Sequence, residues 1–228
     1  MSAPASGRRP RSRRTLSEEE ILDAALVLLD EGGPTAASLR GIAARVGVAP
    51  NAVYTYFPEK ASVIKALGER LLGEVQQHHP EHCDEPWRAC VEALALDLRA
   101  RLAAHPGAVT LMIGGPLDGP HALALQERLL QLLADAGVPD DAAARGAHLL
   151  IVYVFGSIAV EVSTLGQPGQ PAKATDRLTS PRRKLSDAQA QEFPRSSAAA
   201  TIIGSHVSTE QFLWSLHRVL DGIMATAA

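Results

Sequence analysis

The sequence predicts an all-α fold in two parts, a small three-helix N-terminal domain and a larger helical C-terminal domain. Alanine and leucine dominate a hydrophobic fraction of 46%, while aromatic residues reach only 4%. Small and unbranched side chains lose little rotamer freedom in a helix. Apolar residues recur at helical spacing and no strand alternation persists. A length of 228 residues suits one small domain joined to a larger one.

A basic segment, residues 1–15, is expected to form a flexible arm. The net charge of the whole chain is −3, so the residues that follow this basic arm are acidic overall. This distribution excludes a protein that coats nucleic acid with a basic surface. The arm is either a solvated tail or a device that neutralises phosphates or enters a minor groove of DNA. It contains Arg8, Arg9, Arg11, Arg13 and Arg14.

Three short helices are predicted over residues 16–65, together with the start of a fourth. Ser17 and Glu20 form a capping box ahead of the first helix, which Gly32-Gly33-Pro34 ends. Ser38 precedes a second helix over Leu39–Val46, and Gly47 makes the turn to a third over about 51–57, which Pro50 opens. The fourth helix is expected over about 59–77.

This spacing is typical of a helix-turn-helix, in which a small apolar core holds the second helix of the pair so that it projects into the DNA major groove. The segment resembles the DNA-binding domain of the tetracycline-repressor family over about residues 17–65. The residues that carry this resemblance are Gly32, Gly33, Arg40, Ile42, Ala43, Val46, Gly47, Val48, Val53, Tyr54, Tyr56, Phe57 and Lys60.

The resemblance implies which residues bind operator DNA. Ser38 and Arg40 would contact phosphate or a base edge, and Lys60 would hold the DNA backbone. Tyr54 would be partly structural, with its hydroxyl near a phosphate. The groove-facing set would be Asn51, Ala52, Thr55 and Tyr56. One departure from the family pattern is Ala49, which stands where the family often has a capping Ser or Thr.

The remainder, 66–228, is expected to be a helical effector-binding and dimerisation domain. Helices are predicted at 87–105, 120–136, 140–165 and 208–226, with a long mobile loop at 166–200. The most apolar run, Ala147–Val160, is shorter than the roughly 20 residues of a membrane span, so a core or interface helix in a soluble, cytoplasmic protein is predicted.

The C-terminal part also resembles the ligand-binding half of the tetracycline-binding branch of that family, through Trp87-Arg88, Ala104-His105-Pro106-Gly107, Gly114, Pro116 and Ala134-Asp135-Ala136-Gly137-Val138. Where that branch has polar drug-binding and magnesium-binding residues, this chain has Leu94, Met112 and Gly115. A magnesium–tetracycline effector is therefore disfavoured. An apolar or aromatic, even cationic, effector is expected at Leu94, Leu98, Met112 and Tyr153, residues that could equally be core.

No metal or cofactor is predicted. The cluster His78, His79, His82 and Cys83 has metal-binding residue types, but it lacks a distant partner and contains Pro80, so a solvated helix end is favoured. The two cysteines, Cys83 and Cys90, are expected to be reduced thiols, because two residues make no disulfide framework in a cytoplasmic protein.

The resemblance implies a homodimer that binds a palindromic operator in double-stranded DNA and is released by a small-molecule effector. Apolar helices around Ala147–Val160 and Phe212–Ile223 would form the dimer interface. Two alternatives stay open at this point. One is an activator or a regulator that senses no ligand; the other is a helical enzyme, which lacks support from any nucleotide-binding loop, nucleophile elbow or carboxylate pair.

Overall fold

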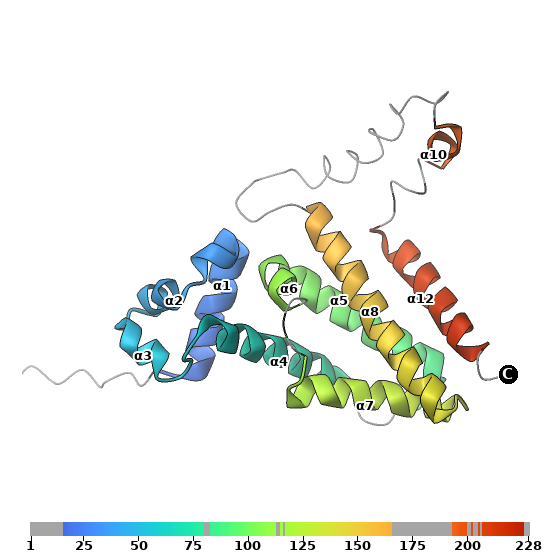
Figure 1. The fold of residues 1–228 in the computed structure, drawn as a ribbon, viewed down its shortest axis with the longest axis horizontal. Helices are drawn as coiled ribbons and strands as arrows, with labels where there is room; N and C mark the ends of the chain where they lie inside the picture. The colour runs from blue at the N-terminus through green and yellow to red at the C-terminus, as the bar shows by residue number, and fades with distance from the viewer. Residues whose placement is uncertain are drawn as a thin grey trace, which may run out of the picture.

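The structure, a computed structural model, describes residues 16–79, 83–112, 115, 117–165, 193–199, 202, 205 and 207–225. These residues form helices joined by turns, which confirms the all-α prediction (Figure 1). The helices are α1 (Glu18–Ala36), α2 (Leu39–Val46), α3 (Pro50–Tyr54), α4 (Lys60–His78), α5 (Trp87–Ala104), α6 (Pro106–Met112), α7 (Pro120–Asp135), α8 (Asp140–Leu165), α10 (Pro194–Ala198) and α12 (Thr209–Met224).

The start of α1 carries the predicted capping box. The Ser17 hydroxyl accepts a hydrogen bond from the Glu20 N–H at 3.2 Å, and the Glu20 carboxylate accepts one from the Ser17 N–H at 3.3 Å. These two bonds satisfy N–H groups that have no partner inside the helix. The regular helix breaks at Gly33, whose φ of 68° lies in the left-handed region, so the predicted stop is where the backbone turns.

Helices α1, α2 and α3 enclose a small apolar core at one end of the molecule. Ile21, Ile42, Ala43 and Val53 are all fully buried there. Gly47 closes α2 with a φ of 80°, and its N–H donates to the Ala43 carbonyl at 3.0 Å. This left-handed residue produces the sharp turn from which α3 leaves.

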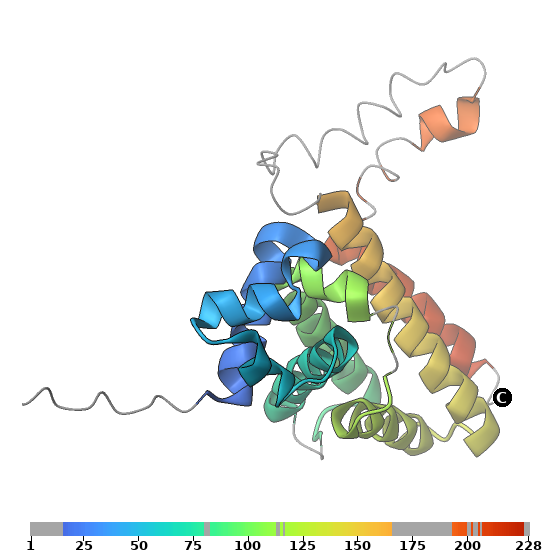
Figure 2. The ribbon, with the colours of Figure 1, turned by 60° about the vertical axis from the view of Figure 1, so that its left-hand side comes forward.

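Helices α5, α6, α7, α8 and α12 form the body of the molecule, with α4 connecting it to the three-helix head (Figure 1 and Figure 2). Helix α5 packs against α4, α7 and α8, and α12 lies alongside α8 at one edge. Only His105 separates the end of α5 from the start of α6, and α6 packs on α1. The head is thereby attached to the body at two places, through α4 and through α6.

Helix α8 has one apolar face inside the body and another outside it. Over Asp140–Ser163 its length and mean hydropathy of 1.6 would suffice to cross a membrane, and 39% of the residues in its most apolar window are buried. Leu149, Val152 and Val160 are about half exposed on the outer face. Because α8 packs against α5, α7 and α12, an interface with another protein chain fits it better than a membrane span.

Two sequence-based expectations are wrong, and a third is corrected only at its end. Cys83 and Cys90 are joined by a disulfide, with Cα atoms 6.3 Å apart, because the chain before α5 folds back onto its first turn. Helix α6 stands where Pro106-Gly107 indicated only a break, although proline suits the first turn of a helix. The predicted loop 166–200 contains helix α10 at its end, while residues 166–192 lie outside the described part.

Candidate nucleic-acid interface and ligand cavities

The outer face of α2 and α3 presents polar side chains on a buried apolar base. Arg40, Asn51 and Thr55 are exposed, Tyr54 is 44% exposed, and Ala52 is half-buried. Val53, between them, is fully buried and fixes the orientation of α3. Amide, hydroxyl, methyl and guanidinium groups on a projecting helix pair are the groups that contact base edges and phosphates in the major groove.

Two of the predicted DNA-contacting hydroxyls also support the helices themselves. The Ser38 hydroxyl accepts a hydrogen bond from the Gly41 N–H at 3.0 Å and so caps α2. The Thr55 hydroxyl donates to the Asn51 carbonyl at 3.0 Å. Ala49, at the same position before α3, makes no side-chain cap, and Pro50 opens the helix in its place. A residue with a structural bond can still offer its other lone pair or its methyl group to DNA.

Tyr56 and Lys60 are tied back to α1. The Tyr56 hydroxyl donates to the carbonyl of Leu16, and the Lys60 ammonium donates to the carbonyl of Pro34. Neither bond could be anticipated from local sequence patterns, because each joins residues far apart in the chain. Together they fasten the turn after α3 to both ends of α1.

The two arginines of α2 differ in what they contact. Arg45 makes a two-pronged bond to the Glu31 carboxylate, at 2.7 and 3.2 Å. No ion pair to Arg40 occurs among the residues the structure describes. Within the described part of the chain, Arg40 is therefore exposed without an ion pair, whereas Arg45 is held by α1.

The head contacts the body through polar and close-packed contacts at α1. A Cβ atom on Gly107 would overlap the backbone carbonyl of Leu29, so only glycine lets α6 approach α1 this closely. His105 Nδ1 lies 2.8 Å from Asp30 Oδ2, and Arg70 on α4 lies 2.6 Å from Asp23. Movement of α4 or α6 would therefore move the head.

The four predicted effector residues do not line one cavity. Met112 lines a hollow of about 540 Å³ between α4 and the end of α6. Tyr153 lines a groove of about 480 Å³ between α8 and α12, where its hydroxyl donates to the Phe212 carbonyl at 2.6 Å. Leu94 and Leu98 border a core cavity of only about 20 Å³ among α5, α7 and α8.

The rim of the hollow beside Met112 carries charge. Lys65 Nζ lies 2.7 Å from Asp118 Oδ1, and this hydrogen bond lowers the pKa of the Asp118 carboxyl. The Asp118 carboxylate therefore keeps its charge to a lower pH than an isolated aspartate does. Glu69, also in the wall, accepts hydrogen bonds from the His121 and Ala122 N–H groups at 2.7 and 3.2 Å, which caps α7.

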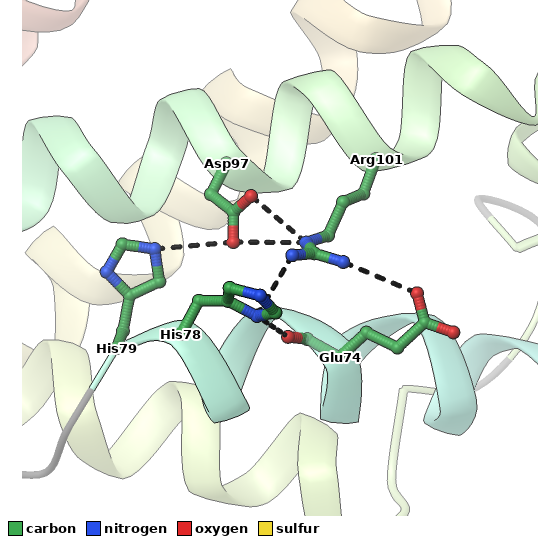
Figure 3. Close-up of polar contacts among 5 residues, drawn as sticks. All are labelled: Glu74, His78, His79, Asp97 and Arg101. Atoms are coloured by element: carbon green, nitrogen blue, oxygen red, sulfur yellow. Dashed lines mark hydrogen bonds and ion pairs between the residues drawn. The ribbon is translucent and has the colours of Figure 1, made fainter.

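A polar cluster joins the end of α4 to α5 (Figure 3). Arg101 bonds both oxygens of Asp97, at 3.0 and 3.1 Å, and approaches Glu74 at 3.4 Å and His78 Nδ1 at 3.0 Å. His79 lies 3.4 Å from Asp97. Of the histidines considered above as metal ligands, His78 thus faces a guanidinium cation, and His82 lies outside the described residues. Cys83 is in the disulfide.

The three-helix head contains a helix-turn-helix, and α4 and α6 attach it to the helical body. The class of protein is therefore a helix-turn-helix protein with a second, helical domain. Residues 21–67 match the family model described as "Bacterial regulatory proteins, tetR family", and residues 79–227 match "Tetracyclin repressor-like, C-terminal domain". The chain therefore belongs to the tetracycline-repressor (TetR) family of bacterial regulatory proteins, as its sequence motifs predicted.

Relatives of known name agree with this assignment. An HTH-type transcriptional regulator of Saccharopolyspora erythraea is 34% identical over 66% of this chain and 63% of its own length. The HTH-type transcriptional repressor DrrR1 of Streptomyces coeruleorubidus is 27% identical over 67% of this chain, and the match spans 57% of that protein. The solved structure of the Streptomyces coelicolor TetR family protein ActR in complex with actinorhodin is 25% identical, with a TM-score of 0.78, and covers 93% of this chain and 99% of that one.

Proposed function

We propose that this chain is a cytoplasmic transcriptional repressor that binds operator DNA as a homodimer and is released by a small molecule bound in its C-terminal domain. The observation that carries the proposal is the exposed polar face of α2 and α3 on a fully buried apolar base. The naming of DrrR1 as a repressor and the actinorhodin bound to ActR support the repressor and ligand parts.

The DNA contacts follow from position on this face. Asn51, Ala52 and Thr55 would meet base edges in the major groove, and Arg40 and Tyr54 would contact phosphates or base edges beside it. Ser38 would contribute through the N-terminal turn of α2 that it caps. Tyr56 and Lys60 would act at the DNA backbone while their polar groups also hold the turn after α3 to α1.

The outer faces of α8 and α12 support a dimer. Leu149, Val152 and Val160 are half exposed on α8, and Gly156 and Gly222 have open space where a side chain would stand. Apolar residues interrupted by glycines allow a second helix pair to approach closely, as in a four-helix interface. A two-fold dimer would present two α3 helices to two half-sites of a palindrome.

The proposal is tested by selecting bound sequences from a randomised duplex library and measuring affinity for the selected site by gel shift. We expect a palindromic site, and we expect Arg40→Ala to weaken binding by about 1–3 kcal/mol, the value of one good DNA contact. Arg45→Ala is the matched control, because Arg45 lies on the same helix as Arg40 but is paired with Glu31 of α1. Equal losses for the two variants, or no selected site, would refute the assigned interface.

A further inference from the structure

The disulfide between Cys83 and Cys90 joins a surface position to a buried one. Cys83 lies on the exposed segment that precedes α5, whereas Cys90, in the first turn of α5, is only 6% exposed. The two residues are seven positions apart in the chain, and their Cα atoms are 6.3 Å apart. A disulfide with one exposed cysteine is open to attack by a thiol from solution while the helical body stays folded.

A disulfide has a particular meaning in a DNA-binding regulator of the cytoplasm. Disulfides are rare in cytosolic proteins, and those that occur there are usually transient bonds of catalysis or redox sensing. Exposed disulfides are also more easily reduced than buried structural ones. The cytoplasmic location is part of the proposed function, whereas the chemistry of the two sulfurs does not depend on it.

Acidic residues beside Cys83 restrict which oxidant reaches it. Asp84 and Glu85 follow Cys83 directly, and both are exposed. Their negative charges repel anionic oxidants, among them the disulfide of glutathione, and have no such effect on a neutral molecule. An uncharged hydroperoxide therefore suits this position better than an anionic disulfide does.

We propose that Cys83 and Cys90 form a reversible redox site that an uncharged hydroperoxide closes and a small thiol opens. In the reduced protein, the Cys83 thiolate attacks the terminal peroxide oxygen. A sulfur–oxygen bond forms, the oxygen–oxygen bond breaks, and the leaving alkoxide or hydroxide takes up the Cys83 proton. The Cys90 sulfur then attacks Cys83, the disulfide forms, and hydroxide leaves with the Cys90 proton as water. Each sulfur loses one electron, and the peroxide gains two.

Reduction uses the same exposed sulfur. A thiolate from solution attacks Cys83, and Cys90 leaves as a thiolate in the first turn of α5, where the helix dipole favours negative charge. The second sulfur of a dithiol reductant then attacks the mixed disulfide. This step frees Cys83 and leaves the reductant as a disulfide.

The redox state would change how the end of α4 is held. The disulfide anchors the chain to α5 four positions after His79, the residue that follows α4. The same end of α4 is held by the cluster in Figure 3, in which Arg101 contacts Glu74 and His78. Opening the disulfide removes the covalent link and leaves the noncovalent contacts, so the last turn of α4 should open locally more often.

The test uses the purified full chain, reduced with dithiothreitol, freed of reductant and exposed in native buffer to an equimolar amount of hydrogen peroxide. After each step the thiols are labelled with iodoacetamide in denaturant, so that burial does not hide Cys90, and are counted by intact mass spectrometry. We expect two labelled thiols before peroxide, none after it at the mass of a single chain, and two again after dithiothreitol. A bond that dithiothreitol opens only in denaturant, or thiols that still label after peroxide, would overturn the proposal.

Two single variants assign the roles of the sulfurs. In Cys90→Ser, the exposed Cys83 should become a sulfenic acid that dimedone traps. In Cys83→Ser, where only the buried Cys90 remains, this adduct should be absent. Cys90→Ala repeats the measurement with an apolar side chain, in case the buried hydroxyl lowers stability. Equal adducts in the Cys83 and Cys90 variants would show that exposure of Cys83 does not direct the reaction.

Hydrogen exchange of the oxidised and reduced wild-type chain tests the structural consequence. We expect faster exchange after reduction in the last turn of α4 and in residues 83–90, with α12 unchanged as the internal control. Equal exchange in the two redox states would overturn the link between the disulfide and the end of α4. These measurements contain no DNA, so the redox site stands or fails independently of the proposed repressor.

Discussion

The Ser38 hydroxyl has a structural bond at a position for which DNA recognition is also proposed. The family resemblance predicts a DNA contact for it, and in the structure its oxygen accepts the Gly41 N–H bond that begins α2. The first turn of a helix has N–H groups with no partner in the helix, so this bond sets where α2 starts. The position of Arg40, two residues later, depends on that start.

We expect Ser38→Ala to lower the free energy of unfolding by about 1 kcal/mol, the usual value of an N-cap. Ser38→Asn, which keeps an accepting oxygen, should lose much less. Thermal unfolding followed by circular dichroism checks both variants. If Ser38→Ala melts like the wild type, the cap contributes nothing to stability, and any loss of DNA affinity then belongs to a direct contact.

At the scale of elements, the predicted helix boundaries agree with the structure where capping and turn residues give a strong local signal. Ser17 with Glu20, Gly47 and Pro50 mark the ends of α1, α2 and α3, because capping and left-handed turns depend on neighbouring residues alone. Helix α6 escapes prediction because Pro106-Gly107 is locally typical of a break. Gly107 is needed because α6 approaches the backbone of Leu29 closely, and this contact can be seen only once the helices are packed.

The same limit applies to the site. The exposed face of α3 could be inferred from the periodicity around Val53, since that residue must point inward. The bonds from Tyr56 to Leu16 and from Lys60 to Pro34 could not, because they depend on how α1 lies against the turn after α3. The scatter of Leu94, Met112 and Tyr153 over three cavities likewise depends on how α5, α6 and α8 cross.

The α1–α6 contact is expected to tolerate no side chain at Gly107. Because a Cβ there would overlap the backbone carbonyl of Leu29, Gly107→Ala must shift one helix and should cost about 1–3 kcal/mol of stability, as overpacking does elsewhere. Gly115→Ala is the control, since its added Cβ would make ordinary contacts of 3.6 and 3.7 Å. Urea unfolding of both variants measures the difference, and similar midpoints would contradict the close approach.

For the whole molecule, the outer surface of α8 is the proposed dimer interface. Gly156→Lys adds a charged chain where the single chain has open space, and lysine has a higher helix propensity than glycine. We therefore expect a monomer that is as stable as the wild-type chain at low concentration but binds operator weakly. Ala124→Lys, at an exposed position of α7, is the control. Sedimentation velocity distinguishes them; a Gly156→Lys dimer would exclude this surface as the interface.

A second prediction for the whole molecule concerns the basic arm, residues 1–15. Deleting residues 1–14 removes five arginines from each chain. If they neutralise phosphates, operator affinity should fall, and the slope of log affinity against log salt should become shallower by about 0.9 for each phosphate that the arginines neutralise. Titrations at several salt concentrations measure this slope. An unchanged slope would mean that the arm is a solvated tail.

The bond between the Tyr56 hydroxyl and the Leu16 carbonyl has a consequence for this arm. It fixes the first described residue of the chain beside the turn that follows α3, the helix proposed to contact DNA. The arginines of the arm precede Leu16 in the sequence, so if they bind phosphates beside the proposed DNA surface, a local effective concentration would govern that encounter, and not the concentration of protein in solution. Tyr56→Phe, which loosens this tether at its base, should lower that effective concentration while leaving every arginine in place.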